Sequence, residues 1–528
     1  MLGFLLALAL PVQAQHERHD DKAPAGLVPQ EILERPVPLR QGIGKVHEEV
    51  TTASPAAQAF YDQGLAYLHS FVWIEAARSF HQALRSDPSM AMAFLGLSDA
   101  YVGLQDFPRA QAAFEKAQSL AMKVSDRERA RLTIRARQLE YLQDSGNLQK
   151  YFAYRQSVTD ALAASPNDPW LWILRGFADE GTPLAHGQGG GMDTIAFYET
   201  ALAFSPGSFV AHHYLAHTLE SHGPPERALE ESEEYVKLAP AIPHAHHMHG
   251  HNLRRLGRTE EAIQEFLKAR ELEDAYYRAE NIPPQFDWHR AHNLQLLAMS
   301  YQSLGQMKAT EEAFRAAFSL PVYTDFAEFN RRAFPEFLLE RSRPQEALAA
   351  SQELMNGHWA MGRFAGHSLA GRALLAMDRL EDAKNELTLA EREMEQLPVS
   401  VIKTLQDTVM LRAAILLREK NWDKANALME QVEEQIVAVP GPDAWSEALF
   451  QLDSIARMAR EAGDWELVDY TARKMIKHDP SYAGGYFASA WVAQHQGNAS
   501  AAGQAFARAN KLWSKADAED QEAQGQKP

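Results

Sequence analysis

Residues 60–83 read FYDQGLAYLHSFVWIEAARSFHQA, and residues 94–117, which lie 34 positions later, read FLGLSDAYVGLQDFPRAQAAFEKA. The aromatic residues Phe60, Tyr67 and Phe80 recur in the second stretch as Phe94, Tyr101 and Phe114, and Ala76 and Ala83 recur as Ala110 and Ala117. A period of 34 residues is typical of stacked helix-turn-helix units. Small residues at this spacing let two helices approach closely, while the aromatic residues fill the contact with the next unit. The sequence therefore predicts an all-α fold built from repeated helical pairs.

The pattern, which includes Gly64 and Pro88, resembles the tetratricopeptide-repeat family. Further repeats follow as far as Tyr486, Ala490, Ala502, Phe506 and Ala509, so the resemblance covers Ala57 to about Trp513. It implies a right-handed superhelix, a solenoid of about 10 to 12 repeats. It also implies a concave groove that binds a protein or peptide partner.

The remaining segments flank this solenoid, which we expect to span residues 53–513. Residues 1–14 are apolar and end in Val12-Gln13-Ala14, a small-x-small pattern that predicts a signal peptide and a periplasmic or secreted protein. Their apolar run of about ten residues is too short to span a membrane, so we expect no transmembrane segment in the mature chain. Residues 15–52 are polar and rich in proline, which predicts a flexible leader, and residues 514–528 predict a disordered tail.

The charge and the absence of cysteine narrow the function classes. The formal net charge of the 528 residues is −18, which disfavours nucleic acid as a partner. With no cysteine, the chain has no disulfide and no thiolate ligand, so any metal would be held by imidazole and oxygen.

Histidines gather in one short part of the chain. Residues 212–217 and 246–251 both read His-His-x-x-x-His and lie one 34-residue period apart, in the histidine-rich repeats that we place at residues 207–274. Nine of the 21 histidines fall between positions 212 and 251. Such an excess indicates a site rather than a requirement of the fold.

The repeat register places four of these histidines on one surface. If Phe209 and Pro243 each open a repeat, His213 and His247 fall at position 5, and His217 and His251 at position 9. The resemblance implies that positions 2, 5, 9, 12 and 13 face the groove. Residues four apart share a helix face, so each pair can grip one cation, and the two pairs could meet around one ion. Glu220 and Glu180, at position 12 of their repeats, would add carboxylates.

A narrower resemblance concerns a subset of exported bacterial tetratricopeptide proteins. Here its pattern reads His213-Tyr214-x-x-His217, then His244-x-x-His247-Met248-x-x-His251, then His292-Asn293-Leu294-Gln295. Gln295 stands where the subset has a further histidine, which puts a ligand role at that position in doubt. The resemblance adds His244 and His292 as candidate ligands.

Three functions fit these observations. The first is an exported scaffold whose histidine-lined groove binds a transition metal, with Cu(II) or Zn(II) favoured by neutral imidazoles, or a small ligand. The second is a metal- or histidine-dependent enzyme, with the glycine-rich residues 181–191 as a lid. The third is a scaffold for protein interaction alone, in which the histidines donate hydrogen bonds to a peptide. His212 and His246, at position 4, are expected to be core residues.

Overall fold

The computed structural model describes residues 27–180, 190–322, 325–397, 405–439 and 441–518. Within these ranges the regular elements are helices and no strand is present, which confirms the predicted all-α fold. The chain divides into two compact units: unit 1 comprises Met1–Asn252 and Glu271–Phe286, and unit 2 comprises Leu253–Arg270 and Asp287–Pro528. The predicted signal peptide, the end of the predicted tail and most of the proposed lid lie outside the described residues.

The helices follow one another with short connections. Those of unit 1 are α1 (Gln30–Leu33), α2 (Pro55–Leu68), α3 (Trp73–Ser86), α4 (Ala91–Gly103), α5 (Phe107–Ser119), α6 (Asp126–Leu142), α7 (Leu148–Ala164), α8 (Pro169–Ala178), α9 (Met192–Phe204), α10 (Phe209–His222) and α11 (Pro225–Leu238). Two helices, α12 (Pro243–Arg255) and α13 (Thr259–Glu280), supply residues to both units.

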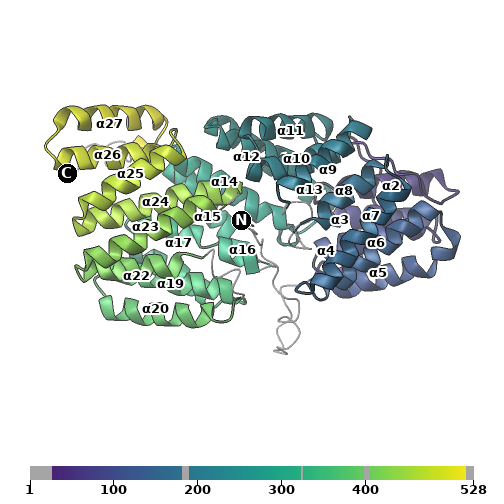
Figure 1. Ribbon diagram of the computed structural model, residues 1–528, viewed down its shortest axis with the longest axis horizontal. Helices are drawn as coiled ribbons and strands as arrows, with labels where there is room; N and C mark the ends of the chain where they lie inside the picture. The colour runs from purple at the N-terminus through teal and green to yellow at the C-terminus, as the bar shows by residue number, and fades with distance from the viewer. Residues whose placement is uncertain (1–26, 181–189, 323–324, 398–404, 440, 519–528) are drawn as a thin grey trace. The chain divides into compact units, whose positions relative to one another are not determined.

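Unit 2 continues with α14 (Trp288–Ser303), α15 (Met307–Ser319), α16 (Asp325–Asn330), α17 (Ala333–Glu340), α18 (Pro344–Met355), α19 (Ala360–Ala376), α20 (Leu380–Met394), α22 (Asp407–Arg418), α23 (Trp422–Ala438), α24 (Pro442–Ala462), α25 (Trp465–His478), α26 (Ala483–His495) and α27 (Ala499–Leu512). Consecutive helices pack as pairs, such as α2 with α3 in unit 1 and α26 with α27 in unit 2 (Figure 1). None of the described helices is both long and apolar enough to cross a membrane.

The packing of Phe80 shows how the repeated residues build these pairs. Its ring on α3 is fully buried and faces Gly64 on α2 and Gly96 on α4. A Cβ atom would lie 2.5 Å from the ring at Gly64 and 2.4 Å from it at Gly96. Only glycine leaves room for the aromatic ring between the two helices, because interiors are packed without spare volume. The small and large positions of the sequence pattern are therefore a single packing unit.

The turn inside a helical pair places one residue in the left-handed backbone region. Phe71, between α2 and α3, has φ 59°, and Gln105, one period later between α4 and α5, has φ 58°. A left-handed residue commonly closes a helix, and glycine is the usual choice. A bulky aromatic residue there is an outlier. The Phe71 ring packs against the ring of His213, so the unusual backbone conformation places an aromatic side chain on this histidine.

Residues 27–54 form an ordered N-terminal strap in unit 1, where the composition predicted a flexible leader over residues 15–52. Main-chain groups of the strap bind groups along several helices: Val28 O accepts from Arg109 (3.0 Å), Pro36 O from Arg78 (2.9 Å) and Gly42 O from Ala241 N (2.8 Å), while Thr51 N donates to Glu128 (2.8 Å). Gly44 has φ 88° and lies against the ring of Phe209. The strap is ordered because these long-range partners satisfy its backbone.

Candidate metal centre

Three imidazoles of unit 1 converge on one point. His213 and His217 lie one turn apart on α10, and His244 is the second residue of α12. The Nε2 atom of His213 lies 3.1 Å from Nε2 of His217 and 3.1 Å from Nε2 of His244, and the third distance, from His217 to His244, is 3.3 Å. Nitrogens bound about 2.0 to 2.1 Å from one ion are themselves about 2.9 to 3.4 Å apart. The triangle therefore has the dimensions of a three-histidine metal site, here called the histidine triad.

Groups behind the rings turn the Nε2 atoms towards this point. His213 Nδ1 is 2.7 Å from the backbone carbonyl oxygen of His69, which can only accept a hydrogen bond. The hydrogen of neutral His213 therefore sits on Nδ1, and Nε2 carries a lone pair. His217 Nδ1 lies 3.2 Å from Glu220 Oε1, a contact that has the same effect. Carboxylates and carbonyls commonly orient metal-binding histidines in this way.

The local charges also suit a cation. Burial lowers the pKa of His213 well below its usual value, and the neighbouring His217 lowers it further, so His213 is neutral at pH 7. For Glu220, burial raises the pKa, but hydrogen bonds and charges from His217 and His251 outweigh it and bring the pKa to about 2. The site thus combines a neutral imidazole ligand with a buried carboxylate, which would offset part of the charge of a bound ion.

Aromatic rings cover the triad, whereas the sequence register placed His213 and His217 on the surface of a concave groove. The Phe71 ring centroid lies 4.8 Å from that of His213, 6.0 Å from that of His217 and 4.9 Å from that of His244. The rings of Tyr214 and Tyr235 stack on His213 at 4.8 and 4.7 Å. These aromatic contacts leave His213 fully buried and His217 5% exposed.

The other histidine pair and Glu220 lie beside the triad. His247 and His251 are one turn apart on α12, with ring centroids 4.3 Å apart, and the His247 ring stacks on His244 at 5.7 Å. Glu220 lies between the two groups, because its second oxygen is 3.6 Å from His251 Nδ1. The structure therefore brings His244, which the sequence offered only as an addition, into the triangle with His213 and His217.

Two further predicted residues, Glu180 and His292, are not members of the triad. Glu180 is buried near Tyr154, Tyr198 and Tyr214. Burial is the largest cause that raises the pKa of these three tyrosines, and the charge of Glu180 raises it further. His292 belongs to unit 2, where its Nδ1 is 3.7 Å from Asp443 Oδ2.

The two position-4 histidines have partners outside the triad. His212 Nδ1 contacts Glu231 Oε2 at 2.6 Å, and His246 Nε2 contacts the carbonyl oxygen of Pro240 at 3.1 Å. No local pattern pointed to His69 or Phe71, because His69 lies 144 residues before His213 in the chain.

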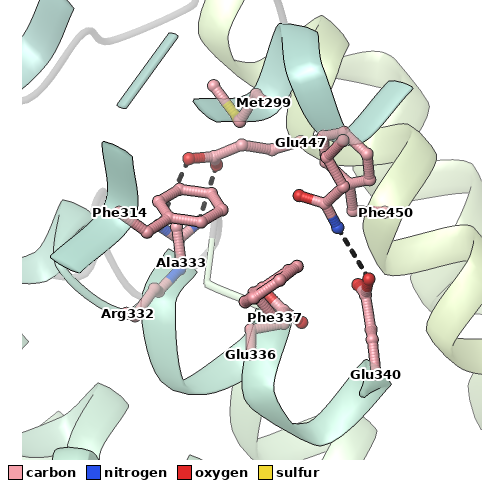
Figure 2. Close-up of a pocket in the computed structure, with 10 residues that line it drawn as sticks. Met299, Phe314, Arg332, Ala333, Glu336, Phe337, Glu340, Glu447 and Phe450 are labelled. Atoms are coloured by element: carbon pink, nitrogen blue, oxygen red, sulfur yellow. Dashed lines mark hydrogen bonds and ion pairs between the residues drawn. The ribbon is translucent and has the colours of Figure 1, made fainter. Parts of the chain in front are cut away.

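Unit 2 contains a small pocket of about 20 Å³ between α14, α15, α17 and α24 (Figure 2). Its charged walls are paired with neighbours: Arg332 Nη2 is 2.7 Å from Glu447 Oε2, and Gln302 Nε2 donates to Glu340 Oε2 at 2.6 Å. Burial and then Asp453 raise the pKa of Glu340 well above its usual value. A space of this volume accommodates about one water molecule. The pocket therefore holds a buried polar network, which the four-residue spacing of Arg332, Glu336 and Glu340 could have indicated.

Comparison with known proteins places the histidine-rich helices within a repeat. A sequence model described as tetratricopeptide repeat matches residues 243–276 and 291–321. The first match begins at Pro243, where the register used above opens a repeat, so His244 occupies position 2. No curated protein matches the chain.

Several solved structures are similar at low identity. A tetratricopeptide repeat protein from Parabacteroides merdae is 17% identical, with 53% of this chain and 99% of that chain covered and a TM-score of 0.36. Yeast Tom70 is 13% identical, with 81% and 91% covered and a TM-score of 0.39. Human IFIT1, solved as a dimer with m7Gppp-AAAA, is 12% identical, with 88% and 91% covered and a TM-score of 0.37. Such distant likenesses carry no conclusion about function.

The family match and the helical pairs agree. Two repeats are matched directly, and the packing of Phe80 between Gly64 and Gly96 shows that helices earlier in the chain also pack as close pairs. The chain therefore contains tetratricopeptide repeats.

Proposed function

We propose that this chain is an exported tetratricopeptide-repeat scaffold that binds a divalent transition-metal ion through Nε2 of His213, His217 and His244. The observation that carries the proposal is the triangle of Nε2 atoms, with sides of 3.1 to 3.3 Å. Three imidazoles without a thiolate suit Zn(II) or Cu(II). Export rests on residues 1–14 of the sequence, and a protein or peptide partner rests on the repeat architecture.

Metal analysis of protein purified without a histidine tag tests the metal site. We expect bound metal in the wild type and, in competition titrations with Zn(II) and Cu(II), a loss of affinity of more than about 100-fold in His213→Ala/His244→Ala, since both changes remove direct ligands. His212→Ala/His249→Ala is the matched control, because it removes one imidazole from each of the same helices outside the triangle. Equal affinity in all three proteins, or no binding tighter than about 10⁻⁴ M, would contradict the proposal.

A metal-dependent enzyme is the second candidate, and one observation favours it. The triad supplies three protein ligands, the number found in catalytic zinc sites, where water takes the fourth position. A Co(II)-substituted protein tests this directly, since an open position predicts that azide changes the visible spectrum of the ion. A spectrum that azide leaves unchanged would exclude an exchangeable position and leave the binding role.

A further inference from the structure

His247 and His251 form a second potential ligand pair in unit 1. They lie four residues apart on α12, so their side chains share one face of the helix. One ring nitrogen of each lies within 4.8 Å of the other, and both side chains are buried. Two imidazoles at this spacing need only small rotations to hold the same ion, whose bonds to nitrogen are about 2.0 to 2.1 Å long.

This pair is not available to the ion of the triad. The Nε2 atoms of His213, His217 and His244 already close a triangle around one point, and His247 and His251 do not belong to that group of ligand atoms. The two groups are nevertheless neighbours, because His247 stacks on His244 with an interplanar angle of 22°. Any ion held by His247 and His251 would therefore be a second ion close to the first.

Glu220 connects the two groups. One oxygen is 3.2 Å from His217 Nδ1, and the other is 3.6 Å from His251 Nδ1. Both rings therefore turn Nδ1 towards the same carboxylate and Nε2 away from it. For His217 that orientation points Nε2 into the triad, and for His251 it leaves Nε2 on the side of the ring away from Glu220. Glu220 therefore orients His217 of the triad and His251 of the second pair.

We propose that unit 1 is a two-metal centre, in which a second divalent transition-metal ion binds His247 and His251 and the Glu220 carboxylate orients one ligand of each ion. This inference rests on the proposed function of the triad and adds the second site to it. Two imidazoles leave coordination positions for water or for a group of a bound ligand.

Metal stoichiometry tests the proposal in the full-length protein. The protein is purified without a tag, dialysed against buffered Zn(II) at a free concentration that saturates both sites, and its bound zinc is measured by mass spectrometry. We expect two zinc ions per chain in the wild type, one in His247→Ala/His251→Ala and one in His213→Ala/His244→Ala. His249→Ala on the same helix is the matched control and should keep two, and circular dichroism checks that each variant is folded.

The outcomes separate the two proposals. A wild type that binds one ion, lost in His213→Ala/His244→Ala, overturns the second site and leaves the proposed function standing. A wild type that binds no ion overturns both. These two results come from the wild type or the triad variant, so they do not depend on whether His247→Ala/His251→Ala folds. If that variant fails to fold, His247→Asn/His251→Asn replaces it, because asparagine is closer in size to histidine.

Discussion

At the scale of single residues, the site depends on groups that do not touch the proposed ion. The carbonyl oxygen of His69 and the carboxylate of Glu220 fix the two ligands of α10, and the Phe71 ring packs on all three imidazoles. Phe71 does so from a left-handed backbone conformation, which is strained for a residue with a Cβ atom. Unfavourable backbone geometry persists where the surrounding packing compensates for it, and here that packing is the cover of the triad.

The Glu220→Gln variant should bind metal about 10- to 100-fold more weakly than the wild type, the usual effect of losing a group that orients a ligand. Glutamine has the same size but no charge, so it keeps the packing and removes the anion beside His217 and His251. Zinc titration measures the effect. Glu231→Gln, which removes the carboxylate beside His212, is the control, and an equal loss of affinity in both variants would contradict a positioning role for Glu220.

Glu433 on α23 predicts a pH dependence of stability. Burial raises its pKa to about 7, against a smaller opposing effect of its hydrogen bond with Thr471. The folded state therefore holds a proton that the unfolded state releases between pH 4.5 and 7, so stability falls as pH rises through this window. Because glutamine does not titrate, Glu433→Gln should remove up to about 3 kcal/mol of this loss of stability. The free energy of unfolding of the variant should therefore rise relative to that of the wild type between pH 5 and pH 8.

Urea unfolding at the two pH values measures that change. Glu434→Gln is the neighbouring control, because a hydrogen bond with Lys474 lowers the pKa of Glu434 and confines its titration to more acidic conditions. A stability difference between Glu433→Gln and the wild type that is the same at both pH values would show that Glu433 is charged throughout.

At the scale of elements, the N-terminal strap shows how tertiary contacts order a segment whose composition indicates disorder. It is rich in proline and polar residues, yet its backbone bonds reach Arg78, Arg109, Glu128 and Ala241. Gly44 is the tightest point, because its φ is 88° and a Cβ atom there would lie 2.3 Å from the Phe209 ring. Phe209 is the first residue of α10, the helix that carries His213 and His217.

We expect Gly44→Ala to destabilise the protein by about 2 to 5 kcal/mol, the sum of left-handed strain and overpacking. Gly146→Ala is the control, since no atom lies within 4 Å of a Cβ atom at that glycine. Thermal unfolding of both variants measures the difference. If Gly44→Ala were as stable as Gly146→Ala, the strap would not pack on α10 as described.

At the scale of the whole molecule, the chain divides into two units, and the triad lies within unit 1. An ion that binds only the folded state stabilises it by RT ln(1 + [L]/Kd), which is about 2.7 kcal/mol at 100 times Kd. Because the ligands belong to unit 1, this stabilisation acts on that unit first.

Hydrogen exchange with and without Zn(II) tests this division. We expect zinc to slow exchange of the amides of α10, where two ligands lie, by up to about 100-fold, and to leave α26 and α27 in unit 2 nearly unchanged. Equal slowing in both units would mean that they unfold together, and no slowing on α10 would contradict binding at the triad.

The sequence by itself determined the helical pairs, the 34-residue register and the two i, i+4 histidine pairs, because these depend on local periodicity. It also predicted that His213 and His217 share one face of α10, since position 5 and position 9 are one helical turn apart. Only the tertiary structure decided that His244 meets His213 and His217, because the contact depends on the separation and axial shift of α10 and α12. The cover by Phe71 and the hydrogen bond to His69, which lies 144 residues before His213, depend on contacts between distant parts of the chain, and no local pattern encodes them. The order of the strap also depends on the tertiary structure, because its hydrogen-bond partners are distant in the chain. The composition of a segment carries no information about such partners.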